Sequence, residues 1–218
     1  MSMVKELLKT HIRNAELDEF LAQELKEAGY GGCEVQRTPL GTRITIYVLR
    51  PGLVIGVRGV GIKSLTEKIE KKFNLQNPQL VILEVEVPEL NPYIMANRIT
   101  KLMAKGIAFR RAAIWALNTI MRAGALGAEI VISGKLRSDR AHYEKFRAGI
   151  IPKSGYLSEV AVSEGKAELL LKLGMYGVKV KIARKEAIIP EFSFKEVKQV
   201  EGAEGEGSKE VGGEGSPS

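Results

Sequence analysis

The glycine-punctuated run "VIGVRGVGIKSL", residues 54–65, places the strongest constraint on how this chain folds. Its glycines stand at positions 56, 59 and 61, between a short apolar segment and a stretch, 62–73, whose apolar residues recur at helical spacing. Glycine lets the backbone turn tightly and approach a ligand closely, and the free N–H groups of a helix N-terminus attract anions. The run therefore predicts a phosphate-binding turn that opens a helix.

Three interpretations of this turn compete. A nucleotide-binding P-loop needs its lysine directly after the last glycine. Here Ile62 separates Gly61 from Lys63 and Ser64, and one helical residue rotates the chain by about 100°, which points both side chains away from the phosphates. A second interpretation is a turn that only connects two elements. The third is a turn that holds the backbone of a nucleic acid.

The hydrophobic pattern predicts the elements on either side of the turn. Apolar residues at helical spacing predict a helix over 15–28, and the β-branched runs "CEVQRT" and "TRITIYVLR" predict a hairpin that turns at 39–41. The segment "LVILEVEV", 80–87, predicts a half-buried strand with Leu83, Val85 and Val87 on its buried face. The order is helix, strand, strand, glycine turn, helix, strand.

This order and the glycine run resemble a KH module of prokaryotic type, whose GXXG loop clamps single-stranded nucleic acid. The resemblance implies that apolar Val54, Ile55 and Ile62 floor a groove for bases, while Arg58 adds positive charge beside the phosphates. The residues predicted to contact RNA are Val54, Ile55, Gly56, Val57, Arg58, Gly59, Ile62 and Lys63.

The pattern changes after residue 90. Asn91-Pro92 is typical of a helix start, because a capping side chain precedes a proline at the first helical position. The helical stretch that follows is interrupted at Gly106 and ends at Gly124. Strands are predicted at 128–133, 156–163 and 177–183, with a short helix or turn at 165–174. From residue 201 glycine, glutamate and serine dominate, which predicts a disordered tail.

Three segments extend the resemblance: "RPGLVIG", "RRAAIWALNTIMRAGALGAEIVISGKLRSDRA" and "GMYGVKVKIARKEAIIP". Together they resemble the S3 family of small-subunit ribosomal proteins, in its archaeal and eukaryotic branch. The resemblance implies an α+β fold with a KH type-2 domain, built of helices on a three-stranded sheet, and a C-terminal α/β sandwich with a small mixed sheet. The expected boundaries are 1–15 for an N-terminal segment, 16–90 for the KH domain, 91–105 for a connecting helix, 106–190 for the C-terminal domain and 191–218 for a flexible acidic tail.

The family resemblance also implies a function: a structural role in the head of the small ribosomal subunit, ribosome-bound in the cytoplasm, with rRNA, mRNA and neighbouring head proteins as partners. In the family, a basic pair on the first helix of the second domain faces the mRNA entry channel and supports unwinding of the message. Arg110 and Arg111 match that pair, and a helical wheel places Arg111 and Arg122 opposite the apolar side of the helix. Bacterial members carry a third basic residue where this chain has Ile114, which lowers the charge of the face.

A second basic segment, "GKLRSDRAHYEKFRAG", covers 134–149. We expect it to bind rRNA phosphates, with Tyr143 or Phe146 available to stack on bases. The alternative is a surface loop whose basic side chains pair with Asp139 and Glu144. The basic residues predicted to contact rRNA are Lys135, Arg137, Arg140, Lys145 and Arg147.

The amino-acid composition limits which other kinds of function are compatible with this chain. The formal charge is +7, and the tail beyond residue 200 holds five glutamates and one lysine, so the rest of the chain is more basic still. This favours a polyanionic partner. One cysteine and two histidines leave no plausible zinc site, so we expect no metal, no cofactor and no catalytic residue. No apolar segment approaches the roughly 20 residues of a membrane span, so we expect no membrane association, and no homo-oligomer.

Two other functions stay open at this point. A free KH regulator would bind single-stranded RNA away from the ribosome. An enzyme would use either an NTPase site at 56–64 or a lyase lysine, and hydrolysis of ATP that is lost on Lys63→Ala would favour it.

Overall fold

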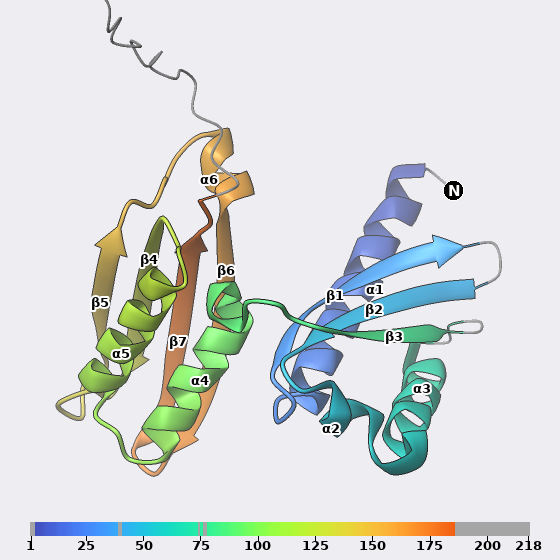
Figure 1. The fold of residues 1–218 in the computed structure, drawn as a ribbon, viewed down its shortest axis with the longest axis horizontal. Coiled ribbons are helices and arrows are strands. Elements are labelled where there is room, and N and C mark those ends of the chain that lie inside the picture. The colour runs from blue at the N-terminus through green and yellow to red at the C-terminus, as the bar shows by residue number, and fades with distance from the viewer. Residues whose placement is uncertain (1–2, 39–40, 74, 76–77, 186–218) are drawn as a thin grey trace, which may run out of the picture. The chain divides into compact units, whose positions relative to one another are not determined.

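The computed structural model describes residues 3–38, 41–73, 75 and 78–185, and its mixture of helices and strands confirms the predicted α+β class (Figure 1). The acidic tail predicted from residue 191 lies outside the described residues.

The first half of the chain forms a three-stranded sheet with helices. Its elements are α1 (Met3–Glu24), β1 (Tyr30–Thr38), β2 (Gly41–Val48), α2 (Pro51–Ile55), a 3-10 turn (Val57–Gly59), α3 (Val60–Phe73) and β3 (Gln79–Glu84). The strands lie in the order β1-β2-β3, with β1 antiparallel and β3 parallel to β2. The predicted order of elements is confirmed, and α2 is a short helix that the prediction did not include.

One hydrophobic core joins these helices to the sheet. It consists largely of alternate residues of β2 and one stripe from each long helix, because a strand shows one face at every second residue and a helix at every third or fourth. Its buried members include Leu17 and Leu21 of α1, Leu25 directly after that helix, Ile44, Ile46 and Val48 of β2, and Leu65 and Ile69 of α3.

Two predictions for this half were wrong in their details. The helix predicted over 15–28 runs from Met3 to Glu24. Residues 3–14 contain no glycine or proline and are rich in good helix formers, so the helix forms there although its first turns are exposed. The strand predicted over 80–87 ends at Glu84, and Leu80 and Ile82 pack on the core while Leu83 and Val87 are exposed.

The second half forms a four-stranded sheet covered on one face by two helices (Figure 1). Its elements are a 3-10 turn (Pro88–Leu90), α4 (Pro92–Ala104), α5 (Phe109–Arg122), β4 (Gly127–Gly134), β5 (His142–Gly149), α6 (Tyr156–Ala161), β6 (Val162–Leu171) and β7 (Gly174–Ala183). The strands lie in the order β5-β4-β7-β6, and every neighbouring pair is antiparallel. The mixed sheet expected here was therefore wrong in its pairing.

The start of α4 follows the sequence closely. Asn91 Oδ1 accepts hydrogen bonds from the backbone N–H groups of Tyr93, at 3.0 Å, and Ile94, at 3.3 Å, which confirms the predicted cap. Gly106, with a φ of +86°, separates α4 from α5. The segment 91–105 was expected to be a connecting helix, but its buried side chains, such as Ile99 and Met103, pack in the core of the four-stranded sheet. Helix α4 is thus part of the layer that covers this sheet.

Two elements after residue 150 differ from the prediction. The predicted strand 156–163 is mainly helix α6, and the predicted helix or turn 165–174 is mainly strand β6. Strand β6 pairs along its whole length with β7, and its Ala167 and Leu169 pack toward the core while Glu168 and Leu170 are exposed. Pairing with a neighbouring strand therefore outweighed the local preference of alanine, leucine, lysine and glutamate for helix.

Candidate nucleic-acid interface

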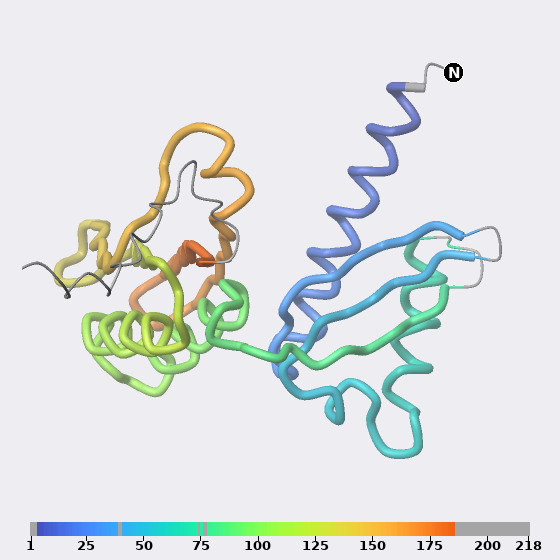
Figure 2. Tube along the Cα trace, turned by 45° about the horizontal axis from the view of Figure 1, so that its top comes forward, coloured from blue at the N-terminus to red at the C-terminus, as the bar shows by residue number. Residues whose placement is uncertain are grey.

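The glycine turn between α2 and α3 has the backbone that its sequence predicts (Figure 2). Gly56 and Gly59 have φ values of +69° and +77°, in the region that favours glycine. Arg58 lies between them with φ 56° and ψ 24°, and no other non-glycine residue in the described ranges has a positive φ. At Gly61 a Cβ atom would lie 2.5 Å from the carbonyl oxygen of Val54. The glycines thus permit both the turn and the close approach of the two helices.

Apolar and basic side chains are exposed together at this turn. Val57 at its tip is 83% exposed, and Arg58 and Lys63 also lie on the surface. Ile62 is half-buried, as a groove floor requires, but Val54 is buried in the core and supports the turn from beneath. The apolar surface for bases would instead come from Leu53, Ile55, Val57 and Val60.

The side chains that suggested a nucleotide site have other roles. Ser64 Oγ donates a hydrogen bond to the carbonyl oxygen of Gly61 at 2.8 Å, within the first turn of α3. The hydroxyl is thus held against the helix backbone, which agrees with the register argument against a P-loop.

The arginines of α5 have different surroundings. The carboxylate of Glu144 accepts hydrogen bonds from Arg110 Nε at 2.9 Å and Nη2 at 3.1 Å, and it also pairs with Arg137 at 2.5 Å. Arg111 is exposed, as the helical wheel predicts, and forms no ion pair with any residue that the structure describes; the same holds for Arg122. Of the two neighbouring arginines, Arg111 therefore has the guanidinium that is free to bind phosphate.

The basic segment 134–149 contains strand β5, whose alternation divides its side chains between two faces. Glu144 and Phe146 point toward the helices, and Phe146 packs against the core, so it is not available to stack on a base. Tyr143, Lys145 and Arg147 lie on the open face, where Tyr143 is 70% exposed. Lys135, Arg137 and Arg140 are exposed before the strand. Pairing with Glu144 engages Arg137, which partly supports the alternative of a salt-bridged surface.

The open face of the four-stranded sheet is basic across its width. Cross-strand register places Arg147, Glu129, Lys181 and Glu164 in one row, and Lys145, Val131, Lys179 and Lys166 in the next. The prediction had missed four lysines on or beside this face: Lys153, Lys166, Lys179 and Lys181. The alternation "VKVKI" at 178–182 was the signal that places Lys179 and Lys181 on one face.

Three lysines surround Glu164 on this face. Burial alone would raise the pKa of its carboxyl, but hydrogen bonds from Lys179, Lys166 and Lys181 outweigh burial and hold the pKa below its usual range. Glu164 is therefore ionised at neutral pH and neutralises part of the lysine charge.

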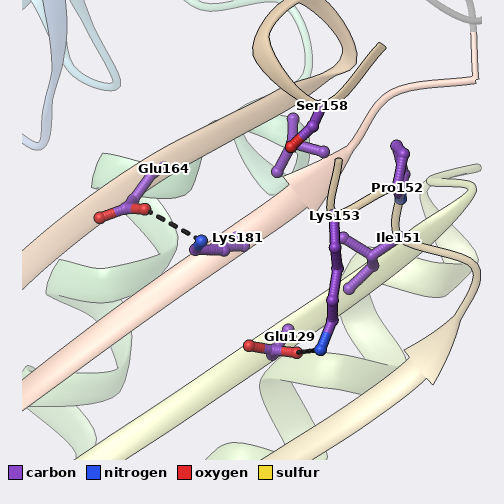
Figure 3. A pocket seen from close by; sticks show the side chains of 8 residues that line it. Glu129, Ile151, Pro152, Lys153, Ser158, Glu164 and Lys181 are labelled. Carbon is purple, nitrogen blue, oxygen red and sulfur yellow. Dashed lines mark ion pairs between the residues drawn. The ribbon is translucent and has the colours of Figure 1, made fainter. Parts of the chain in front are cut away.

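A pocket of about 290 Å³ opens on this face (Figure 3). Residues of three strands, β4, β7 and β6, line it together with residues from the β5–α6 connection and from α6. The side chains that line it are Glu129, Ile151, Pro152, Lys153, Ser158, Val162, Glu164 and Lys181. Lys153 reaches toward Glu129, and Lys181 toward Glu164 (Figure 3).

The described residues give little support for a reactive cysteine, a metal site or a membrane span. Cys33 is half-buried, and burial is the main cause that raises the pKa of its thiol to about 11, which keeps it protonated at neutral pH. Within the described ranges, no three or more histidine, cysteine, aspartate or glutamate side chains are grouped as a metal site would require. None of the helices seen there has the length and apolar character needed to cross a membrane.

Comparison with known proteins gives matches in both halves. A family model described as KH domain matches residues 16–90, and one described as ribosomal protein S3, C-terminal domain, matches residues 99–182. Three similar relatives are named small ribosomal subunit protein uS3. That of Thermofilum pendens is 47% identical over 184 residues, which is 84% of this chain and 91% of the relative. That of Saccharolobus solfataricus is 46% identical over 189 residues, which is 87% of this chain and 82% of the relative. That of Methanothermobacter thermautotrophicus is 44% identical over 187 residues, which is 86% of this chain and 72% of the relative.

Proposed function

The chain belongs to the ribosomal protein S3 family, and from this premise we propose that it is a structural component of the small ribosomal subunit. The family is one of ribosomal structural proteins and not of enzymes. We infer that the chain binds rRNA and neighbouring ribosomal proteins and is ribosome-bound in the cytoplasm. The observation that carries this proposal is similarity to uS3 proteins over more than four fifths of the chain, with family models matched in both halves.

Two surfaces are proposed to bind RNA. One is the glycine turn, where Val57, Arg58 and Lys63 are exposed beside backbone that glycine leaves open. The other is the open face of the four-stranded sheet, with the basic segment beside it. Lysine and arginine side chains that neutralise phosphates release the counterions condensed on the nucleic acid, and this release supplies most of the sequence-independent affinity. We propose that the sheet face binds rRNA and that the glycine turn binds either rRNA or mRNA.

The finer part of the proposal is that α5 faces mRNA at its entry into the small subunit. Arg111 supports it most strongly, because its guanidinium is exposed and Glu144 already pairs with Arg110. Ile114, in the place of a third basic residue, is also exposed, so the face holds fewer cations than in bacterial members.

Arg111→Ala is expected to weaken the binding of mRNA to assembled small subunits more than Arg110→Ala does. Loss of one phosphate contact should lower the steepness of a plot of log affinity against log salt concentration by about 0.7 for single-stranded RNA. Removing Arg110 should change this slope less, because that guanidinium is shared with Glu144. The measurement is the dissociation constant of an mRNA that extends to the entry side, over a range of salt concentrations.

Arg111→Lys is the matched control, since it keeps the charge and should retain most of the slope. If Arg110→Ala equals or exceeds Arg111→Ala in both affinity and slope, the assignment of Arg111 to mRNA is wrong.

A further inference from the structure

The pocket on the open sheet face holds a carboxylate, that of Glu129, with one oxygen that lacks a hydrogen-bond donor within the described residues. Glu129 is 7% exposed, and its Oε2 accepts no hydrogen bond from any residue in the described part of the chain. Lys153 Nζ lies 3.8 Å from Oε2 and Lys145 Nζ lies 3.7 Å from Oε1, both beyond hydrogen-bonding distance. A buried carboxylate is stabilised only when N–H or O–H groups reach it, so the pocket favours an occupant that presents such donors.

The remaining wall of the pocket narrows the chemistry of that occupant. Ile151, Pro152 and Val162 offer apolar contact to a flat group. Lys153 and Lys181 add ammonium groups, which lie beside Glu129 and Glu164 (Figure 3). Glu164 is not free to accept, because Lys166, Lys179 and Lys181 already pair with it at 2.9 to 3.4 Å. The occupant should therefore combine a planar body, adjacent donors for Glu129 and negative charge for the lysines.

We propose that this pocket binds a guanine base of single-stranded RNA, an inference that rests on the proposed RNA-binding function and extends it to one base. The Watson–Crick edge of guanine carries two adjacent donors, N1–H and the N2 amine, which correspond to the two oxygens of Glu129. Oε2 is enclosed in the unbound chain, so the base reaches it only when Lys153, whose ammonium lies 3.8 Å away, moves aside. Its O6 lies beside them and accepts from the Lys153 ammonium. Adenine, cytosine and uracil each present only one donor group on that edge.

Charge favours a nucleotide over the other group that fits a carboxylate, the guanidinium of a partner protein. A guanidinium would enter among Lys145, Lys153 and Lys181 and be repelled by them. A nucleotide brings phosphates that the same lysines and Arg147 attract. In binding, Lys153 exchanges a 3.8 Å contact with Glu129 for contacts to the base and phosphate.

The test compares three heptamers, UUUGUUU, the same sequence with inosine for guanosine, and UUUUUUU, as ligands of the purified full chain. Inosine lacks the N2 amine, so one hydrogen bond to a charged acceptor is lost. The guanosine heptamer should bind about tenfold more tightly than the inosine heptamer, from the usual strength of such a bond. Equal affinities of these two heptamers for the unmodified chain overturn the proposal, and no variant is needed for that result.

Glu129→Gln tests the carboxylate itself. This nearly isosteric change should abolish the preference for guanosine while the affinity for UUUUUUU stays within about twofold, because the lysines remain. Glu168→Gln, an exposed glutamate of β6 that does not line the pocket, should keep the preference. A preference that survives Glu129→Gln, or competition by arginine amide and not by guanosine monophosphate, contradicts the proposal.

These results are separable from the ribosomal role. A chain that prefers guanosine but does not sediment with small subunits would remove the ribosomal proposal and keep the pocket. A chain that sediments with subunits and shows no preference would remove the pocket alone.

Discussion

Aspartate at both Val57 and Arg58 is expected to reduce the affinity of the purified chain for single-stranded RNA by about a hundredfold. The double change moves the charge of the exposed turn by three units toward negative, directly where the phosphates would lie. Two unit charges 4 Å apart in water interact by about 1 kcal/mol, so three units amount to about 3 kcal/mol, or about a hundredfold. Filter binding or fluorescence anisotropy with a labelled oligonucleotide measures the change.

Asparagine at the same two positions separates charge from shape. Asparagine and aspartate both tolerate the left-handed conformation that Arg58 adopts, so both double variants should keep the turn. The asparagine variant loses the charge of Arg58 and the apolar side chain of Val57 but adds no negative charge, and the lost charge alone should weaken binding about fivefold. Similar affinities of the aspartate, asparagine and unmodified chains would remove the glycine turn from the RNA-binding surface.

Gly61→Ala is expected to destabilise the first half of the chain by about 1 to 3 kcal/mol, the usual range for a side chain forced into packed surroundings. Its Cβ would lie 2.5 Å from the carbonyl oxygen of Val54 and 3.1 Å from that of Ile55, and backbone atoms cannot rotate away. The two helices must therefore separate. Amide hydrogen exchange should become faster in β2 and β3 while β4 and β7, in the other core, keep their protection.

Gly52→Ala is the control for this prediction. A Cβ at Gly52 would have no neighbour within 4 Å, and the residue lies in helix α2, so alanine should be neutral or stabilise by about 0.5 kcal/mol. Equal effects of the two alanines on exchange would show that close approach at Gly61 does not support the turn.

Periodicity and turn chemistry were sufficient to predict most of the fold. The start of α4 at Asn91-Pro92, the break at Gly106 and the apolar stripe of α5 each depend on residues within one or two helical turns, and the structure confirms them. Residues 156–171 show the limit of such reasoning, because the predicted strand there is mainly helix α6 and the predicted helix or turn is mainly strand β6. The helix formers of β6 adopt a strand because β7, the next strand along the chain, pairs with all ten residues of β6, and the local helix preference of the sequence does not include this pairing.

The candidate sites also divide into features that local sequence predicts and features that depend on tertiary contacts. The glycine turn was predicted together with its exposed Arg58, because glycine spacing is a local signal. The row that joins Glu129 to Lys181 and Glu164 depends on the register of three strands, and most of one of them, β6, was predicted as a short helix or turn. The pairing of Arg110 with Glu144 likewise joins α5 to β5, a strand that was not predicted. No spacing along the chain gives these contacts.

Sedimentation of a cell lysate at moderate salt tests the central claim most directly. If the chain is a structural component of the small ribosomal subunit, most of it should sediment with small subunits, and only a minor fraction should remain at the top of the gradient. If most of the chain instead sediments as a free monomer, the ribosomal role is contradicted and a free KH-type RNA-binding regulator becomes the better account.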